Sequence, residues 1–168
     1  MKNNYIWYAC YGSNLLRERF MLYITGGKCR FNGKRYDGCT DKSEPLEEKA
    51  ISISYTLYFA KHSPSWSNCG VAFLMPEKDL EAATLGKAYK ITEEQFDDVH
   101  RQEGKGWYDK ILDLGMVDGT LVKTFTHSVI CPSNKPSQEY FEVVSLGLKE
   151  TYPQITDEQI KTYLLDSL

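Results

Sequence analysis

The alternation of hydrophobic and polar positions near the N-terminus predicts a buried strand, a tight turn and an amphipathic helix. The run from Tyr5 to Tyr8 is aromatic and β-branched, a composition typical of a buried strand. Gly12 permits a sharp turn that a side chain would obstruct, and Ser13 and Asn14 are residue types that cap helix N-termini. Apolar side chains then recur on one helical face, at Leu16, Phe20, Tyr23 and Ile24.

The turn between this strand and helix is a candidate anion site. Backbone N–H groups at a helix N-terminus point toward one place, and the helix dipole favours negative charge there. Most turns of this composition are only turns, so spacing alone leaves both interpretations open. No phosphate-binding glycine pattern follows, and the nucleophile-elbow pattern G-x-S-x-G is absent because Gly12 directly precedes Ser13. Ser13 is therefore a poor candidate for a covalent nucleophile.

The middle of the chain alternates between strands and polar segments. Residues 28–47 are polar and contain glycine, which predicts a long surface loop. The run from Ala50 to Ala60 alternates apolar with small polar residues and predicts one half-buried strand. Further strands are expected at 70–75, 83–91, 108–114 and 119–131, with a turn at 115–118 between the last two.

Three more helices are predicted from their N-cap residues. Thr92 and Gln95 have the spacing of a capping box. Ser137 can cap a helix that continues to about residue 148, and Thr156 a last helix that ends near residue 165. Strands and helices mixed in this order indicate an α+β protein, and the length of 168 residues indicates one domain over residues 1–168.

One position of the helix after Thr92 breaks its apolar pattern. Phe96 and Val99 mark the buried face, and the next inward position by helical spacing is Glu103. Its side chain either turns outward at a fraying helix end or faces a cavity, and the pattern leaves the two equally open. If it faces a cavity, desolvation raises the pKa of its carboxyl toward neutrality, which suits a general base.

Composition narrows the class of protein. A net charge of −3 gives no reason to expect nucleic acid or an anionic membrane as a partner. No apolar run approaches the roughly 20 residues that span a bilayer. We expect no signal peptide, because Met1–Asn4 lead directly into the predicted first strand. Five scattered cysteines without C-x-x-C, and three histidines without H-x-x-x-H spacing, indicate a reduced cytoplasmic protein with no bound metal. The 12 tyrosines, 7 phenylalanines and 3 tryptophans suit a pocket lined by rings.

Several of these segments together resemble the γ-glutamylcyclotransferase family. The resemblance covers residues 5–150 and rests most on two motifs, Tyr11-Gly12-Ser13-Asn14-Leu15 after the first strand and Gln102-Glu103-Gly104 at a helix end. Shorter matches are Glu18-Arg19, the Trp66–Gly70 loop, Tyr108 and the Pro136–Tyr140 segment. The chain departs from the family pattern in an expanded segment 29–49, a shorter spacing from Glu103 to Tyr108, and Cys10 before Tyr11.

The resemblance implies a fold, a reaction and a set of site residues. The implied fold is a mixed β-barrel or sheet of about five to seven strands with flanking helices. The implied reaction converts a small-molecule γ-glutamyl amide to 5-oxoproline and a free amine, without cofactor or metal, in a monomer or homodimer. Glu103 would be the catalytic base and then acid, while the substrate supplies its own nucleophile. The implied substrate-binding residues are Tyr11, Gly12, Ser13, Asn14, Leu15, Tyr108 and Tyr140, with the loop amides holding the α-carboxylate or the oxyanion.

Alternatives stay open at this level. The domain could bind a γ-glutamyl or 5-oxoproline metabolite without turnover, or the fold could carry another amide-cleaving or acyl-transfer reaction. As an enzyme, its leaving group could be an amino acid, a polyamine-type amine, a peptide-linked lysine or an aminoglycoside. Asn14 argues against glutathione as the substrate, because the glutathione-degrading branch of the family has Tyr-Gly-Ser-Leu at this loop, where this chain has Tyr-Gly-Ser-Asn. Arg17 and Arg19 are expected on a solvated helix face.

Overall fold

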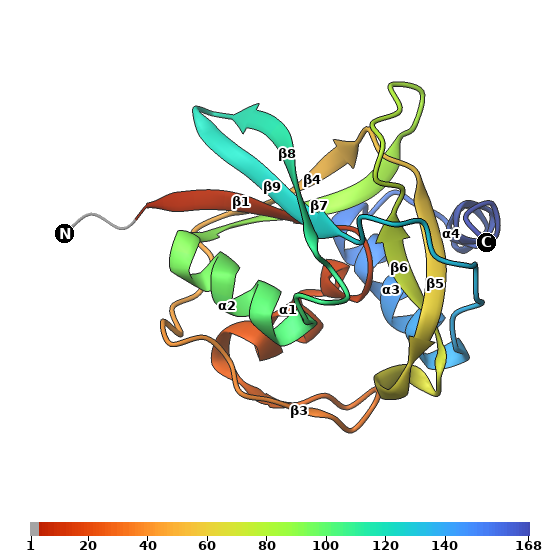
Figure 1. The fold of residues 1–168 in the computed structure, drawn as a ribbon, viewed down its shortest axis with the longest axis horizontal. Coiled ribbons are helices and arrows are strands. Elements are labelled where there is room, and N and C mark those ends of the chain that lie inside the picture. The colour runs from red at the N-terminus through yellow and green to blue at the C-terminus, as the bar shows by residue number, and fades with distance from the viewer. Residues whose placement is uncertain (1–3) are drawn as a thin grey trace.

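A five-stranded mixed sheet forms one wall of the protein in the computed structural model, which describes residues 4–168 (Figure 1). In spatial order its strands are β4 (Glu48–Ile53), β7 (Thr84–Thr92), β1 (Tyr5–Cys10), β9 (Thr120–Thr126) and β8 (Lys110–Val117). The central strand β1 pairs antiparallel with β7 and parallel with β9. The sheet is therefore mixed, with the aromatic N-terminal segment at its centre, where both faces are buried.

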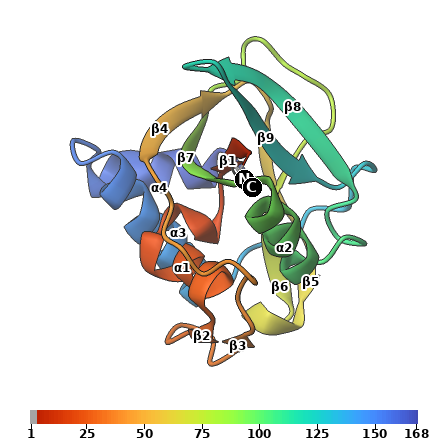
Figure 2. The same ribbon diagram turned by 90° about the vertical axis from the view of Figure 1, so that its left-hand side faces the viewer.

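Two smaller sheets complete the β structure of residues 4–168. The short hairpin of β2 (Gly27–Lys28) and β3 (Arg35–Tyr36) lies on the side of the helices away from the large sheet (Figure 2). The longer hairpin joins β5 (Leu57–Ser63) to β6 (Cys69–Leu74). The strand order of the large sheet is open at both ends, so within residues 4–168 the expected α+β fold takes its sheet form and not a closed barrel.

The helices cover the sheet and frame the hairpins. Helices α1 (Arg17–Thr25) and α2 (Glu93–Glu103) lie side by side beneath the large sheet in both views (Figures 1 and 2). Helix α3 (Gln138–Thr151) packs on the 3-10 turn η1 (Ser13–Leu15), and α4 (Asp157–Leu165) packs on α3. A second 3-10 turn, η2 (Pro64–Trp66), lies within the β5–β6 hairpin. No helix within residues 4–168 has the length and hydrophobicity that crossing a bilayer requires.

Stacked aromatic rings join the sheet to the helices beneath it. The Tyr8 ring on β1 stacks on Phe20 of α1 at 5.5 Å and on Phe125 of β9 at 5.4 Å between centroids. Phe20 also stacks on Tyr89 of β7 at 4.0 Å. Offset-stacked rings add to the area they bury, so this column fixes α1 against the centre of the sheet.

The expected helix caps are present. Thr92 accepts from the Gln95 amide while the Gln95 side chain accepts from the Thr92 amide, the reciprocal capping box that the sequence predicts. Ser137 caps α3, and Thr156 caps α4 with a second capping box. These local signals set the helix starts because each satisfies amides that the helix itself leaves unpaired.

Three strand predictions are wrong in extent. The expected single strand from Ala50 to Ala60 is β4 and β5, which belong to different sheets and are separated by residues 54–56. The carbonyls of Ser54 and Thr56 accept from loop amides, so the chain turns there without leaving them unpaired. The expected strand 119–131 ends at residue 126. The expected strand 108–114 continues to Val117, so the hairpin turn lies at 118–119 and not at 115–118. Asp118 and Gly119 form this turn with positive φ values of 51° and 76°.

Candidate active site

A cavity of about 540 Å³ opens where the end of β1, the two central helices and the β5–β6 hairpin meet. Every residue of the predicted site except one contributes to its wall: Tyr11, Gly12, Ser13, Asn14, Glu103, Tyr108 and Tyr140. These residues come from four separate segments of the chain. The fold therefore brings together, in one concave site, residues that are far apart in the sequence.

Glu103, at the C-terminus of α2, lies on the cavity wall, on the inward side that the helical spacing predicts. Its Oε1 accepts a hydrogen bond of 2.9 Å from Asn14 Nδ2. Protein surrounds the carboxyl, and the part of its surface that remains exposed faces the cavity. Burial raises the pKa of the Glu103 carboxyl above its usual value, while Arg19, Asn14 and Tyr23 partly oppose that rise.

Asn14 links the loop to the catalytic candidate instead of capping a helix. Its Nδ2 donates to both the Tyr8 hydroxyl (3.1 Å) and Glu103. The expectation that Ser13 and Asn14 are N-caps is wrong, because residues 13–15 form a separate 3-10 turn and Leu16 is the N-cap of α1. These bonds orient the side chain toward Tyr8 and Glu103. Its Oδ1, the atom that would accept a capping bond, has no hydrogen-bond partner within residues 4–168.

Gly12 is required by the close approach of other elements to the loop. A Cβ at this position would lie 2.7 Å from the Tyr140 hydroxyl oxygen and 3.0 Å from the Ala72 Cβ. A side chain at this position would collide with both neighbours, so the lack of space requires glycine here. The bare backbone of the loop thus forms part of the cavity wall.

Leu15 is the one predicted site residue that does not line the cavity. Its side chain is fully buried behind the loop, and its amide donates to the Gly12 carbonyl at 3.1 Å. The Leu16 amide likewise donates to Ser13 at 3.3 Å. For Gly12 and Asn14, no acceptor of the backbone N–H lies within the part of the chain that the structure describes. The anion-binding capacity of the loop therefore lies before Leu15.

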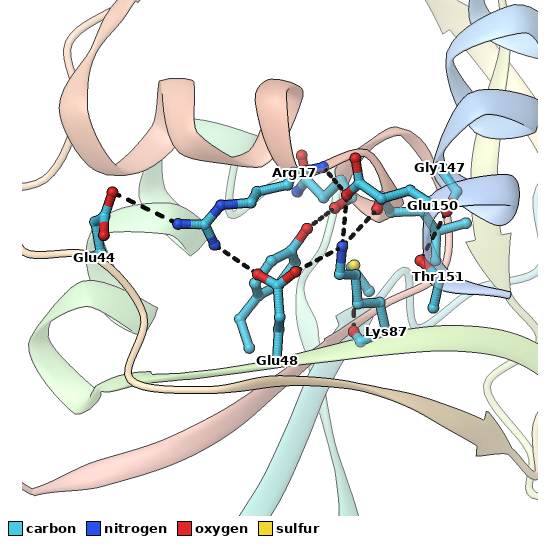
Figure 3. Close-up of polar contacts among 11 residues, drawn as sticks. Arg17, Glu44, Glu48, Lys87, Gly147, Glu150 and Thr151 are labelled. Atoms are coloured by element: carbon cyan, nitrogen blue, oxygen red, sulfur yellow. Dashed lines mark hydrogen bonds and ion pairs between the residues drawn. The ribbon is translucent and has the colours of Figure 1, made fainter. Parts of the chain in front are cut away.

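A charged network behind the loop holds it in place (Figure 3). The buried Lys87 Nζ on β7 donates to Glu150 Oε1 on α3 at 2.7 Å, and lies 3.3 Å from Glu48 Oε1 and 3.4 Å from the Leu15 carbonyl. Glu150 also accepts from the Arg17 amide at 2.9 Å. One lysine therefore connects β4, β7, α3 and the loop.

Replacing Lys87 by methionine should destabilise the fold by about 1–3 kcal/mol, because Glu48 and Glu150 would lose their buried partner while staying partly hydrated. The measurement is the midpoint of thermal unfolding. Lys49→Met is the matched control, since Lys49 pairs at the surface with the exposed Asp118 and should shift the free energy of unfolding by less than about 0.5 kcal/mol. Equal stability of the two variants would show that the network is not needed to hold the loop.

The three tyrosines of the predicted site differ in their hydrogen bonds. Tyr11 donates to the Phe125 carbonyl at 2.7 Å, which commits its proton. The Tyr140 hydroxyl accepts from the Ala72 amide at 3.0 Å, so its own proton is available to a ligand. Tyr108 makes a long 3.5 Å contact with the Ala72 carbonyl. Burial raises the pKa of Tyr140 to about 12, so that its hydroxyl remains a donor at neutral pH.

The expectation that Arg19 lies on a solvated helix face is wrong. Its side chain is only 2% exposed and lines the cavity. Helical spacing contained the signal, because position 19 lies three residues after Leu16 and four before Tyr23 on the apolar face of α1. Arg17, by contrast, is partly exposed, as expected for its face.

The segment 29–49 forms part of the cavity wall instead of being only a surface loop. Lys34 and Tyr36 from the β2–β3 hairpin line the cavity. The segment that follows is tied to α2, where Gln102 Oε1 accepts from the Gly38 amide at 3.0 Å and Asp98 Oδ2 accepts from the Thr40 amide at 3.0 Å. Sequence reasoning missed this contribution because the segment is bound to α2 through its own backbone amides, and backbone amides leave no residue pattern.

Within residues 4–168, no group of three or more histidine, cysteine, aspartate or glutamate side chains is placed to hold a metal ion. The five cysteines are all unpaired and scattered through the fold. The polar side chains that line the cavity include the carboxyl of Glu103, the guanidinium of Arg19, the ammonium of Lys34, the amides of Asn14 and Gln102, and several hydroxyls.

Solved structures share this architecture. A γ-glutamyl cyclotransferase superposes with a TM-score of 0.65 over 95% of this chain and 86% of its own, at 19% identity. The uncharacterized human protein loc79017 gives 0.66 with the same coverage and identity. A yeast γ-glutamyl cyclotransferase described as specific to glutathione gives 0.52 over 97% of this chain and 95% of its own, at 13% identity. The chain has the γ-glutamyl cyclotransferase fold.

No family model matches the chain. A protein of Arabidopsis thaliana named histone deacetylase 5 is 35% identical over 155 residues, which is 90% of this chain. The matched region is 23% of that protein, so the chain spans about a quarter of the length of its relative.

Proposed function

We propose that the protein is a cofactor-free γ-glutamyl cyclotransferase that releases 5-oxoproline and a free amine from a γ-glutamyl amide. The observation that carries the proposal is the Glu103 carboxyl, which faces the cavity and is hydrogen-bonded to Asn14 of the glycine loop. The fold of the solved γ-glutamyl cyclotransferases supports the same reaction.

Glu103 acts first as a base and then as an acid. Its carboxylate takes a proton from the substrate α-ammonium group, and the nitrogen attacks the γ-carbonyl carbon of the same molecule. The amide C–N bond then breaks. Glu103 returns its proton to the departing nitrogen and also transfers the second proton that the attacking nitrogen loses on forming the ring amide, so the amine leaves as an ammonium ion. Because the nucleophile and electrophile belong to one molecule, holding the glutamyl chain in a near-ring conformation supplies much of the rate enhancement.

Donors of the glycine loop and of Tyr140 bind the negative charges of the substrate and of the transition state. The amides of Gly12 and Asn14 hold the α-carboxylate, since neither N–H group has an acceptor within the described residues and unpaired amides at a turn favour an anion. The Tyr140 hydroxyl donates to the oxyanion that develops on the γ-carbonyl oxygen. Tyr11 and Tyr108 contribute walls that restrict the glutamyl chain.

The test is product analysis by mass spectrometry after incubation with a panel of γ-glutamyl amino acids and γ-glutamyl amines. We expect 5-oxoproline from at least one member, and the most rapidly converted member identifies the leaving amine. Tight binding across the panel without any product would support the alternative of a metabolite-binding domain on the same fold.

The Arabidopsis relative motivates one more arm of the panel. Its name denotes amide cleavage of another kind, and 35% identity over 90% of this chain makes that activity a second candidate. A peptide with an Nε-acetylated lysine therefore belongs in the panel. Release of acetate, with no 5-oxoproline from any γ-glutamyl compound, would favour the second candidate over the first.

The pH dependence of kcat/KM should report the environment of Glu103. Catalysis needs the deprotonated carboxylate, and burial raises the pKa of this carboxyl, so activity should fall on acidification at a pH above about 4.3, the usual value for glutamate. The measurement is kcat/KM for 5-oxoproline release between pH 4 and 9. A rate that stays constant down to pH 4 would exclude a buried glutamate as the base.

A further inference from the structure

A cysteine and a histidine are in contact on the loop of residues 127–136, which leads from β9 to α3. The Cys131 Sγ lies 3.8 Å from His127 Nδ1, within hydrogen-bonding range for sulfur. Both side chains are partly exposed, and neither contributes to the wall of the cavity described above. A thiol beside an imidazole that can take its proton is the arrangement that makes a cysteine nucleophilic.

The backbone of the loop holds the His127 ring in place. Its Nδ1 lies 3.2 Å from the Val129 amide nitrogen and 2.9 Å from the Val129 carbonyl oxygen. An unprotonated Nδ1 accepts from the amide, and a protonated Nδ1 donates to the carbonyl. The ring therefore needs no new position when it takes a proton, which favours its use as a base.

Asp109 fixes the start of the loop and adds a negative charge near His127. Its carboxylate accepts from the Ser128 amide at 2.8 Å and from the Ser128 hydroxyl at 2.7 Å. These two bonds, together with the nearby His127, lower the pKa of the Asp109 carboxyl below its usual value. Asp109 is therefore ionised at neutral pH, and its charge partly balances the one that His127 gains on taking a proton.

The rest of the loop is fastened to β5 by its backbone (Figure 1). The Cys131 amide donates to the Tyr58 hydroxyl at 3.2 Å, and the Asn134 amide donates to the Phe59 carbonyl at 3.0 Å. The Cys131 side chain takes no part in these bonds. A group added to its partly exposed sulfur atom therefore does not have to break them.

The other four cysteines of residues 4–168 lack this combination of exposure and a neighbouring base. Burial raises the pKa of Cys39 to about 12, and it also raises that of Cys10. Cys69 is partly exposed, but the partner of its Sγ within the described residues is the Ser67 carbonyl, at 3.5 Å. Three of the four are at most 2% exposed: Cys10, Cys29 and Cys39. Cys69 is thus a control for Cys131 within the same molecule.

We propose that Cys131 is a site of reversible modification by low-molecular-weight disulfides, with His127 as the base. His127 takes the thiol proton, and the Cys131 sulfur attacks one sulfur atom of a disulfide R–S–S–R. A new S–S bond joins Cys131 to one R–S group while the original S–S bond breaks, and the other R–S⁻ leaves with the proton from His127. Cys131 is oxidised to a mixed disulfide, and the other half of the small disulfide is reduced to R–SH. The site is separate from the cavity and does not depend on the proposed reaction.

Incubation of the folded protein with bis(hydroxyethyl) disulfide tests the proposal. Intact mass spectrometry should show one adduct per chain that dithiothreitol removes, and peptide mapping should place it on Cys131. The rate constant at Cys131 should exceed that at Cys69 by about 10-fold or more, because Cys131 and not Cys69 contacts a histidine in the described part of the chain. Equal rates at the two positions, or faster modification of a buried cysteine, would overturn the proposal.

Two variants separate the base from the shape of the loop. His127→Gln should lower the rate constant at Cys131 by about 10-fold and leave that at Cys69 unchanged. Because both rates are measured in one molecule, a general loosening of the fold would change both.

Ser128→Ala is the matched control, because it removes the hydroxyl bond to Asp109 and keeps the imidazole. Its rate constant at Cys131 should stay within about twofold of the wild-type value, as for other surface substitutions. An undiminished rate in His127→Gln, or equal slowing in both variants, would show that His127 is not the base and would overturn the proposal.

Discussion

Glu103→Gln should lower kcat/KM for 5-oxoproline release by about 100-fold or more, the range expected when a general base is removed. Glutamine still accepts the hydrogen bond from Asn14 Nδ2, which spans 2.9 Å in the wild type, so the loop keeps its position. The variant therefore removes proton transfer and leaves the cavity in shape. The measurement is the rate of 5-oxoproline release from the best substrate of the panel.

Glu94→Gln is the matched control for this experiment, because Glu94 is exposed on the first turn of the same helix. Its activity should equal that of the wild type. Full activity of Glu103→Gln would show that another group moves the proton and would remove the basis of the mechanism.

Stability gives an independent check on the same variant. Because the pKa of Glu103 is raised in the folded protein, its contribution to stability is present below about pH 4.3 and is lost as the pH rises through the folded pKa. The unfolding midpoint of the wild type relative to Glu103→Gln should therefore decrease as the pH rises. A low activity of Glu103→Gln with unchanged or higher stability at pH 8 would separate catalysis from folding.

Gly147→Ala should destabilise the protein by about 2 kcal/mol or more. A Cβ at this position would lie 2.5 Å from the Leu15 Cβ and the Leu16 amide nitrogen, and 2.7 Å from the Leu15 carbonyl carbon. Two of these atoms are backbone, so the loop must shift as a whole, and overpacking of this kind typically costs about 1–3 kcal/mol. An exposed glycine-to-alanine change inside a helix would instead stabilise by about 1 kcal/mol.

The measurement for Gly147→Ala is chemical denaturation together with kcat/KM. The denaturation midpoint and kcat/KM should both fall, because the displaced turn carries Ser13 and Asn14, which line the cavity. Gly106→Ala is the control, since no atom lies within 4 Å of a Cβ there and its backbone is compatible with alanine. A Gly147→Ala protein as stable as the wild type would mean that α3 does not pack as closely against the loop as the structure describes.

The local elements of the fold could be predicted from sequence because their signals are local. The capping box at Thr92 and the Ser137 cap fix helix starts through bonds between residues three apart. The break between β4 and β5 could not be predicted, because their apolar alternation runs on while their partners, β7 and β6, lie in different sheets. Pairing partners are set by tertiary packing, which a single alternating run does not encode.

The site shows the same division between local and distant signals. Helical spacing predicts the inward position of Glu103, and the same rule applied to α1 would have placed Arg19 on the apolar face. In both helices, the charged residue on the apolar face is a residue that lines the cavity. The hairpin residues Lys34 and Tyr36 carry no such periodicity, because β2 and β3 contain two residues each, and only the structure brings them to the cavity.

The measurement that tests the proposed reaction most directly is the isotopic composition of the product formed by the wild type from γ-glutamyl-alanine in water enriched in ¹⁸O. Attack by the substrate nitrogen uses no water. We therefore expect 5-oxoproline without ¹⁸O, together with an equal amount of alanine. Glutamate carrying one ¹⁸O atom would show that water attacks the γ-carbonyl, and would contradict the assignment of this protein as a cyclotransferase.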